Sequence, residues 1–466
     1  MGPCIAKADV NGDGLEDLFI GAGVGQQSML YLQTKDGHFV LSSSQPWNSN
    51  LLPFNADALF FDADGDGDMD LYLVSGGAEY PFGSKNYRGR IFENDGKGNF
   101  KEVLNALPDL SISSSCARAA DIDHDGRQDI FIGGRVKPGM FPVTPESYIL
   151  RNVSTKGKIR FEFDKSQKDT TLSHPGMVTD AVWVDINKDG WMDLVVVGQF
   201  MPVTVFENHQ GILLNKTNQY GLSETNGWWN RIKAVDLKGD GHMDLIVGNL
   251  GLNTQLKASA DKPVTITYSD FNEDGTLMPL LCYYIQGKSY PYYTRDELMD
   301  QIPWLQKKFA RYADFADAQL SDIFPAEKLA VAKTIKINLL ESVLLQNTGN
   351  HRLEVKKLPM SAQTSMVNGI VDDHIQGKGS GDLILAGNFY PFRSQFGPLD
   401  AGIGTVLLGD GKGSFATPDY PKTGLDINGD VRNLIKVNGL KGKYWLIAAK
   451  SDGEIQVIER NNQPNN

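Results

Sequence analysis

The sequence predicts an all-β fold, a seven-bladed β-propeller of four-stranded blades, with eight blades as the alternative. Three observations predict it. An acidic loop recurs along the chain, each copy is followed by a run of β-forming residues, and a hairpin turn recurs between the copies. Together they indicate units of four antiparallel strands, about 50–65 residues long. Such units placed around an axis are propeller blades.

The acidic loops share the pattern Asp-x-Asp/Asn-x-Asp-Gly-x-x-Asp and begin at Asp9, Asp62, Asp121, Asp185 and Asp236. Calcium takes about six to eight oxygen ligands. Alternating residues at positions 1, 3 and 5 turn their oxygens to one side of a tight loop, and the glycine at position 6 permits the sharp turn. We expect position 7 to offer its carbonyl and position 9 to close the shell. The predicted ligands are Asp9, Asn11, Asp13, Leu15, Asp17, Asp62, Asp64, Asp66, Asp68, Asp70, Asp121, Asp123, Asp125, Arg127, Asp129, Asp185, Asn187, Asp189, Trp191, Asp193, Asp236, Asp240 and Asp244.

The EF-hand is the competing interpretation of these loops. It requires Glu at position 12 and flanking helices. Position 12 is instead Ile20, Leu73, Ile132, Val196 or Val247, always inside the β-forming run. The pattern therefore excludes an EF-hand, and four intact copies argue against ordinary Asp-Gly turns.

The fifth loop and two further segments depart from the pattern. Lys238 replaces the oxygen ligand at position 3 of the fifth loop, so we expect its ammonium where calcium would lie, or weak binding. A sixth stretch offers Asp270, Asn272 and Asp274 but carries Met278 at position 9, and metal there stays open. The segment 372–382 keeps a β-forming run without the acidic pattern, which indicates a metal-free blade.

Hairpin turns alternate with the acidic loops. The clearest are 94–100 and 409–415, with looser copies at 35–39, 208–211 and 347–350 and another headed by Asn152. Six units follow, starting near residues 3, 56, 115, 178, 230 and 366. The tail forms a seventh with three strands at 432–437, 444–447 and 454–458. Either this blade is short or its fourth strand lies upstream, in a longer polypeptide of which this chain is a part.

The fifth unit is oversized and carries an insertion, so the single propeller domain spans 1–466 with a helical insertion at 294–329. Thr294 and Glu297 form a capping box, and apolar residues then recur at helical spacing. Pro303 should kink this helix or start a second one. We expect a helical hairpin packed on the propeller.

The amino-acid composition argues against several classes of function. The formal charge is −12, with 57 acidic and 45 basic residues, which argues against nucleic-acid binding. The three cysteines are widely spaced and form no zinc motif, so we expect buried free thiols. The sequence contains no apolar run of 18 residues, so it predicts no membrane-spanning helix. No motif pairs a nucleophile with a histidine, so an enzyme is the less favoured reading.

The acidic loops, together with Gly198-Gln-Phe200 and Gly387-Asn-Phe389, resemble the FG-GAP (integrin-α-type, VCBS) repeat family. The resemblance implies a seven-bladed propeller with calcium between the first and second strands of each blade. It also implies an extracellular or cell-surface location, with a periplasmic or outer-membrane-anchored protein as the alternative. The ligand is expected to bind on the face opposite the calcium loops. The His174–Asp180 and Tyr293–Leu298 runs resemble bacterial surface proteins that also carry an ASPIC/UnbV domain, which is not visible in this chain.

The loops expected opposite the calcium loops are aromatic and basic. The candidate ligand residues are Tyr80, Arg88, Arg135, Trp228, Trp229, Phe389, Tyr390 and Arg393. Aromatic residues and arginine are enriched at binding hot spots, although they also suit packing between blades. We therefore predict a monomeric, non-catalytic module that recognises a protein or glycan at a bacterial surface. The alternative is a polysaccharide lyase, favoured if Arg135, Tyr390 and Arg393 surround one pocket.

Overall fold

The computed structural model describes residues 2–43, 45–377, 379, 381–391, 397–419, 423–451 and 453–461. Arg393, one of the candidate ligand residues, lies outside these ranges. Most elements are β-strands in antiparallel sheets and the helices are short, which confirms the all-β prediction.

Seven sheets follow one another along the chain, each pairing its strands in sequence order. The first three comprise β1 (Ile5–Ala8), β2 (Asp17–Ile20), β3 (Met29–Gln33) and β4 (Phe39–Ser42); β5 (Phe54–Phe61), β6 (Asp70–Gly76), β7 (Arg90–Asn94) and β8 (Phe100–Glu102); and β9 (Ser113–Ala120), β10 (Asp129–Val136), β11 (Tyr148–Asn152) and β12 (Phe161–Phe163). The fourth comprises β13 (Met177–Val184), β14 (Asp193–Met201), β15 (Thr204–His209) and β16 (Ile212–Asn215), with β17 (Gly227–Trp228) beside β14. The last three comprise β18 (Arg231–Val235), β19 (Asp244–Gly248), β24 (Val343–Asn347) and β25 (Leu353–Lys357); β26 (Gly369–Asp373), β27 (Asp382–Ala386), β28 (Thr405–Gly409) and β29 (Phe415–Ala416); and β30 (Val431–Asn438), β31 (Lys443–Lys450) and β32 (Gln456–Asn461).

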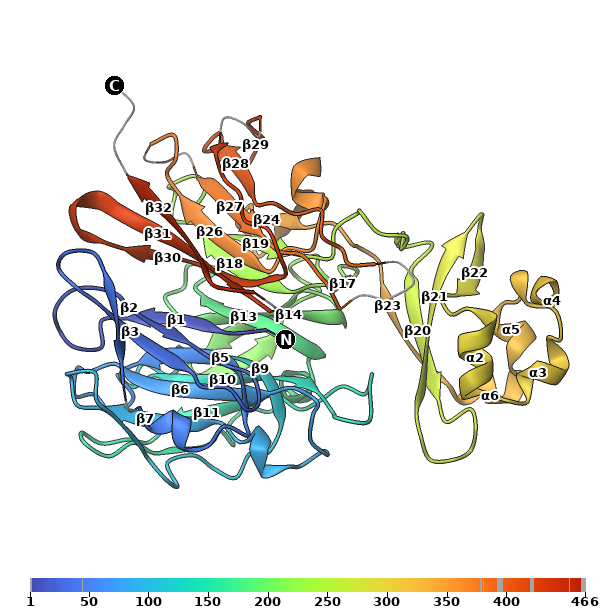
Figure 1. Cartoon of the computed structure of the whole chain (residues 1–466), viewed down its shortest axis with the longest axis horizontal. Coiled ribbons are helices and arrows are strands. Elements are labelled where there is room, and N and C mark those ends of the chain that lie inside the picture. The colour runs from blue at the N-terminus through green and yellow to red at the C-terminus, as the bar shows by residue number, and fades with distance from the viewer. Residues whose placement is uncertain are drawn as a thin grey trace.

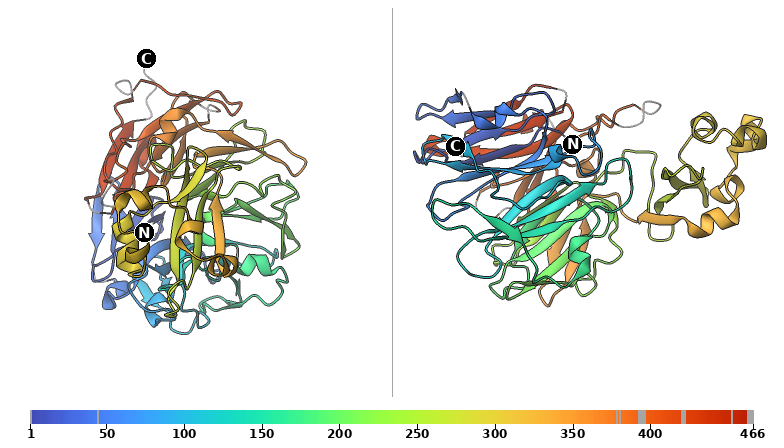
Figure 2. Two further views of the ribbon diagram at one scale, coloured as in Figure 1. Left: turned by 90° about the vertical axis from the view of Figure 1, so that its right-hand side faces the viewer. Right: turned by 90° about the horizontal axis from the view of Figure 1, so that it is seen from below.

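The first strands of the seven sheets form a closed cycle. In the order β1, β5, β9, β13, β18, β26 and β30, each contacts the next, and β30 contacts β1 (Figure 1). In the left panel of Figure 2 the sheets follow one another around a centre. This cycle of antiparallel sheets is a propeller-like arrangement, and the number of blades stays a prediction. Short helices lie in the connections: η1 (Pro46–Ser49), η2 (Lys85–Tyr87), α1 (Thr170–Ser173), η3 (Met360–Gln363) and η4 (Leu440–Gly442).

The cycle closes without strand exchange in the described chain. The last sheet has three strands, as expected, and β1 already belongs to a complete first sheet. Closure comes from an apolar cluster that joins Ile5 and Ile20 to Val437 and Trp445. Hydrogen bonds add to it, because the Asn438 N–H donates to Glu16 over 2.6 Å.

An asparagine at the end of the third strand ties neighbouring sheets together. Asn208 Nδ2 donates to the Ile122 carbonyl of the preceding sheet (2.9 Å) and to the Met192 carbonyl of its own (3.1 Å). Asn94, Asn152 and Asn347 make the equivalent pair of bonds. Gln33 bridges the first and last sheets in the same way. The sequence indicated these residues only as the heads of hairpin turns.

Asn208→Ala is expected to lower the free energy of unfolding by about 2–4 kcal/mol, because Asn208 is fully buried and its loss leaves two carbonyls without a donor. Chemical denaturation followed by tryptophan fluorescence would measure it. Asn99→Ala is the control, since Asn99 is exposed and its side chain binds only Asp95; its effect should stay within about 0.5 kcal/mol. Equal effects of the two substitutions would contradict the bridging role.

The insertion lies between β19 and β24 and is larger than the sequence indicated. It contains a sheet of its own, formed by β20 (Val264–Ser269), β21 (Met278–Ile285), β22 (Lys288–Pro291) and β23 (Lys333–Ile337). Its helices are α2 (Arg295–Gln301), α3 (Leu305–Lys308), α4 (Tyr312–Ala316), α5 (Leu320–Ile323) and α6 (Ala326–Val331). The capping box is confirmed, with Thr294 N–H donating to Glu297 over 2.7 Å, and α2 ends just before Pro303.

The expected helical hairpin packed on the propeller is wrong. The helices bury Leu298, Ile302 and Phe324 against Phe271 and Leu280 of the insertion, and both figures show them standing away from the ring of sheets (Figures 1 and 2). Helical spacing showed the helices but not the surface that they cover. That surface belongs to the sheet of the insertion, in which the Asp270 loop joins β20 to β21.

Two smaller expectations concern the whole chain. Cys4, Cys116 and Cys282 are buried free thiols, as predicted. Among the described residues, no helix combines the length and the apolar character that a membrane span needs.

Candidate calcium loops and a central pocket

The acidic loops connect the first and second strands of the first five sheets, and the Asp270 loop connects β20 to β21. In all six, the carboxylate at position 1 accepts the N–H groups of positions 5 and 6. Asp62 accepts from Asp66 (3.2 Å) and Gly67 (3.0 Å), and Asp9, Asp121, Asp185, Asp236 and Asp270 do the same. The aspartate at position 5 then accepts the N–H of position 7.

Two positions in each loop have left-handed backbone. Glycine at position 6 has φ of 75–100°, as the sequence predicted. Position 4 also has φ of 60–77°, and it is glycine in three loops but His124, Lys188 and Glu273 in the others. The sequence did not predict the left-handed backbone at position 4, because glycine, the usual sign of that conformation, is absent there in three of the six loops.

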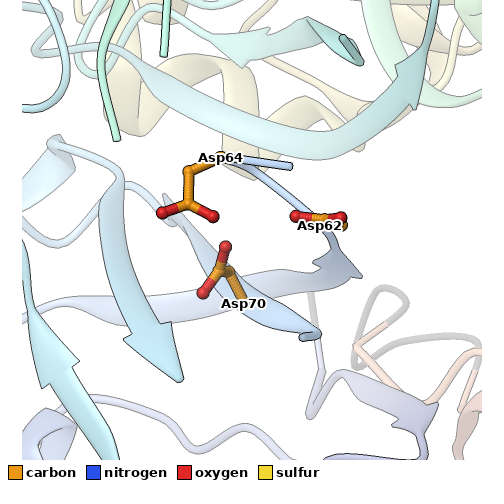
Figure 3. Close-up of side chains that lie close together, drawn as sticks. All are labelled: Asp62, Asp64 and Asp70. Carbon is orange, nitrogen blue, oxygen red and sulfur yellow. The ribbon is translucent and has the colours of Figure 1, made fainter. Parts of the chain in front are cut away.

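The loops with aspartate at position 3 bring three carboxylates together. Oxygens of Asp62, Asp64 and Asp70 lie within 4.8 Å of one another, and those of Asp121, Asp123 and Asp125 do likewise. In Figure 3, the carboxylates of Asp64 and Asp70 face each other beside Asp62. Several oxygens at this separation are the donor set that calcium prefers, so the residues fit the ion. A bound calcium ion would supply the positive charge that these carboxylates share.

The aspartate at position 9 also links its loop to the third strand of the sheet. Asp70 accepts the N–H of Ala63 at position 2 (3.0 Å) and the N–H of Asn94 at the end of β7 (2.9 Å). Asp17 and Asp193 make the same two bonds. In the sixth sheet, Asp382 accepts from Gln376 and Gly409, although that loop has lost the acidic pattern. The aspartate at position 9 therefore has a structural role in addition to its predicted role as a metal ligand.

Burial raises the pKa of these linking carboxyls, although their backbone donors oppose the shift. The pKa of Asp70 and of Asp193 rises to about 7, and that of Asp17 and of Asp129 to about 6. Nearby aspartates add to the rise, because like charges disfavour ionisation. These loops thus concentrate negative charge that a cation would stabilise.

A pocket of about 380 Å³ opens at the opposite ends of the inner strands. Its walls include Cys4, Asp57, Ser115, Thr179, Arg231 and Asn433, which come from or adjoin six of the seven first strands, while the acidic loops follow the other ends of those strands. The pocket therefore lies on the propeller axis, away from the acidic loops. The insertion rises beside it, since Trp228, Phe389 and Met366 pack in one cluster with Val264 and Ile266 of β20.

The candidate ligand residues divide into those in the pocket and those elsewhere. Arg135, Trp228 and Phe389 line it. Tyr80 and Arg88 lie outside it, with the Tyr80 hydroxyl donating to Leu52 and Arg88 paired with Asp109. Tyr390 is 38% exposed but does not line the pocket. The prediction for Trp229 is wrong, because it is fully buried in the core between the fourth and fifth sheets.

A family model described as "FG-GAP-like repeat" matches residues 9–73, 76–132 and 162–247. The chain carries FG-GAP-like repeats. These segments hold all five acidic loops that join first and second strands, so the loops that predict the fold also decide the family resemblance. The association with an ASPIC/UnbV domain stays a prediction.

Solved structures provide weaker likenesses to this FG-GAP-like chain. An Agrocybe aegerita lectin that recognises non-reducing terminal N-acetylglucosamine is 14% identical, with a TM-score of 0.45 over 89% of this chain and 79% of the lectin. BBS1N in complex with ARL6DN is 10% identical, with a TM-score of 0.43 over 100% and 94%. A Bacillus licheniformis rhamnogalacturonan lyase is 12% identical, with a TM-score of 0.31 over 62% and 57%. No curated protein sequence matches the chain. At these scores the likenesses identify no ligand.

Two FG-GAP-like loops hold basic side chains among their carboxylates. Arg151 contacts Asp123 (3.1 Å) and Asp129 (2.7 Å) in the third loop, which the sequence had suggested was an intact site. Arg151 comes from β11, so loop spacing alone could not reveal it. In the fifth loop Lys238 Nζ donates to the Asn347 carbonyl over 3.3 Å. The His242 N–H, followed by the charge of Lys238, lowers the pKa of Asp240.

Proposed function

We propose that this chain is a non-catalytic glycan-recognition module whose acidic loops bind calcium and whose central pocket binds the ligand. The pocket carries the proposal, because it places Arg135 and the indole of Trp228 at the centre of the ring, opposite the acidic loops. Aromatic rings and a few polar donors in a concave site are typical of ligand pockets. Calcium stabilises the scaffold without entering this pocket.

The acidic loops suit a calcium-rich environment. Extracellular modules bind calcium in the range of about 10⁻⁴–10⁻³ M. The first, second and fourth loops offer the strongest sites, since no basic side chain pairs with their aspartates among the described residues. We therefore assign the module to a cell surface or extracellular location.

A polysaccharide lyase is the competing function, and the chemistry of the pocket favours recognition over it. The carboxylate of Asp57 in the pocket wall accepts from Arg118 over 2.6 Å, which holds it in an ion pair rather than poised as a base. The other ionisable groups of the described wall are Arg135, Arg231, Arg432 and the thiol of Cys4, whose pKa burial raises so that it stays protonated.

A glycan array read together with a product assay tests the proposal. The purified chain in millimolar calcium should bind a defined subset of glycans and release no shortened or unsaturated product from them. Trp228→Ala should abolish this binding, whereas Tyr80→Ala, which alters a residue outside the pocket, should not. Product release would establish the enzyme, and binding that survives Trp228→Ala would place the ligand elsewhere.

A further inference from the structure

Arg135 occupies an unusual place in the third sheet. In the pairing of β9 with β10, Gly134 faces Ser114 and Val136 faces Ser113, so Arg135 is skipped in the register. Such a bulge turns a side chain out of the regular alternation and is often found beside functional sites. Here it accompanies an arginine that lines the central pocket.

The arginines around Arg135 have counter-charges. Arg118 pairs with both Asp57 and Asp180, and Asp180 also lies 3.6 Å from Arg231. Arg432 pairs with Asp430 over 2.6 Å. Among the described residues in or next to the pocket wall, these four arginines, Arg135 included, face three aspartates, so one positive charge is in excess.

That excess charge belongs to Arg135. In the part of the chain that the structure describes, its guanidinium makes no ion pair and no hydrogen bond, and burial alone lowers its pKa to about 10. Arginine nevertheless stays protonated at neutral pH. A half-buried cation without a counter-charge among the described residues favours an anionic ligand, and a planar guanidinium matches the two oxygens of a carboxylate.

The rest of the wall suits a sugar. Trp228 and Phe389 contribute aromatic surface to the wall. The amides of Gln199 and Asn433 also line the pocket. A volume of about 380 Å³ lies within the range of small-ligand sites and admits one or two sugar rings.

We propose that the central pocket binds a carboxylate-bearing sugar residue, with Arg135 holding the carboxylate and Trp228 contacting the sugar ring. This inference rests on the proposed glycan recognition and names the class of glycan. A peptide C-terminus also carries a carboxylate, but the flat face of a sugar ring is the better match for the aromatic wall that Trp228 and Phe389 provide.

Titration calorimetry with matched probes tests the inference. Oligogalacturonate should bind, whereas the same oligomer with its carboxyls reduced to alcohols should bind at least about tenfold more weakly. Arg135→Met should remove this preference, and Arg135→Lys should restore only part of it, because an ammonium lacks the two parallel donors. The control is Arg160→Met, which removes an exposed arginine paired with Glu162 outside the pocket.

Stability gives a second readout. Arg135→Met should leave the melting temperature unchanged or raise it, because no partner loses a bond, so loss of binding would not reflect unfolding. Equal binding of the acidic and reduced oligomers, with Trp228→Ala abolishing both, would overturn the inference and leave glycan recognition intact. Preference for a peptide with a free C-terminus over its amide, without glycan binding, would overturn both. Failure of every carboxylated glycan to bind would also overturn the inference.

Discussion

Adding millimolar calcium to the chelated protein is expected to raise its melting temperature by several degrees. A ligand at ten times its dissociation constant stabilises the folded state by about 1.4 kcal/mol per site. The three loops without a basic partner, at Asp9, Asp62 and Asp185, would together contribute about 4 kcal/mol. Differential scanning calorimetry in chelator and in calcium would measure the shift.

Substitutions separate the loops from general effects of salt. The double change Asp62→Asn and Asp64→Asn removes two of the three carboxylates that lie within 4.8 Å in the second loop, so it should remove roughly a third of the calcium effect. Asp410→Asn is the control, because Asp410 is an exposed acid in the β28–β29 hairpin. The same melting temperature with and without calcium would contradict calcium binding.

In chelator, acidification from about pH 7.5 to about pH 5.5 is expected to raise the melting temperature. The pKa values of Asp70 and Asp193 are raised to about 7 in the fold against 3.8 in the unfolded chain, so the folded state binds more protons between these values. Stability therefore increases as pH falls through that window. Calcium should oppose this trend, because it needs the ionised oxygens. Loss of stability on acidification in chelator would count against raised pKa values.

Two adjacent tryptophans should behave in opposite ways. Trp229→Ala is expected to cost about 3–5 kcal/mol of unfolding free energy, because the side chain is fully buried and its indole N–H donates to the Thr225 carbonyl over 3.0 Å. Trp228→Ala should cost less, because Trp228 is only half-buried and its N–H has no acceptor in the described residues. Chemical denaturation of both variants would measure the difference.

Ligand binding supplies the matched test of this pair. Trp229→Ala should bind glycan normally at temperatures where it remains folded, whereas Trp228→Ala should not bind. A binding loss in Trp229→Ala that persists in a fully folded sample would restore the original prediction for that residue.

The features predictable from sequence are those that local spacing determines. A nine-residue acidic loop contains its own hydrogen bonds, such as those from the N–H groups of Asp66 and Gly67 to Asp62. Because these bonds are local, the loop can be recognised from the order of its residues alone. The three-stranded last sheet follows from three apolar runs for the same reason. Alternation of loop and hairpin then determines the order of strands in each sheet.

Features that depend on contacts between distant segments were not predictable. Trp228 ends β17 and Trp229 follows it directly, yet one lines the pocket and the other fills the core between the fourth and fifth sheets. Arg151 reaches the third loop from another strand, and the bulge at Arg135 appears only when β9 and β10 are paired. The insertion sheet was missed because its single acidic loop, at Asp270, departs from the pattern with Met278 at position 9.

The asparagine bridges make neighbouring acidic loops depend on one another. In the second loop, Ala63 gives its N–H to Asp70 of the same loop and its carbonyl to Asn152 of the next sheet. Asn152 in turn gives its own N–H to Asp129 of the third loop. An ion that orders one loop therefore also orders a residue that anchors the next, which lowers the entropy that the next ion must overcome. Calcium should thus bind cooperatively to the loops that these asparagines connect. The coupling between loops should stop at the sixth sheet, where Gly409 replaces the asparagine.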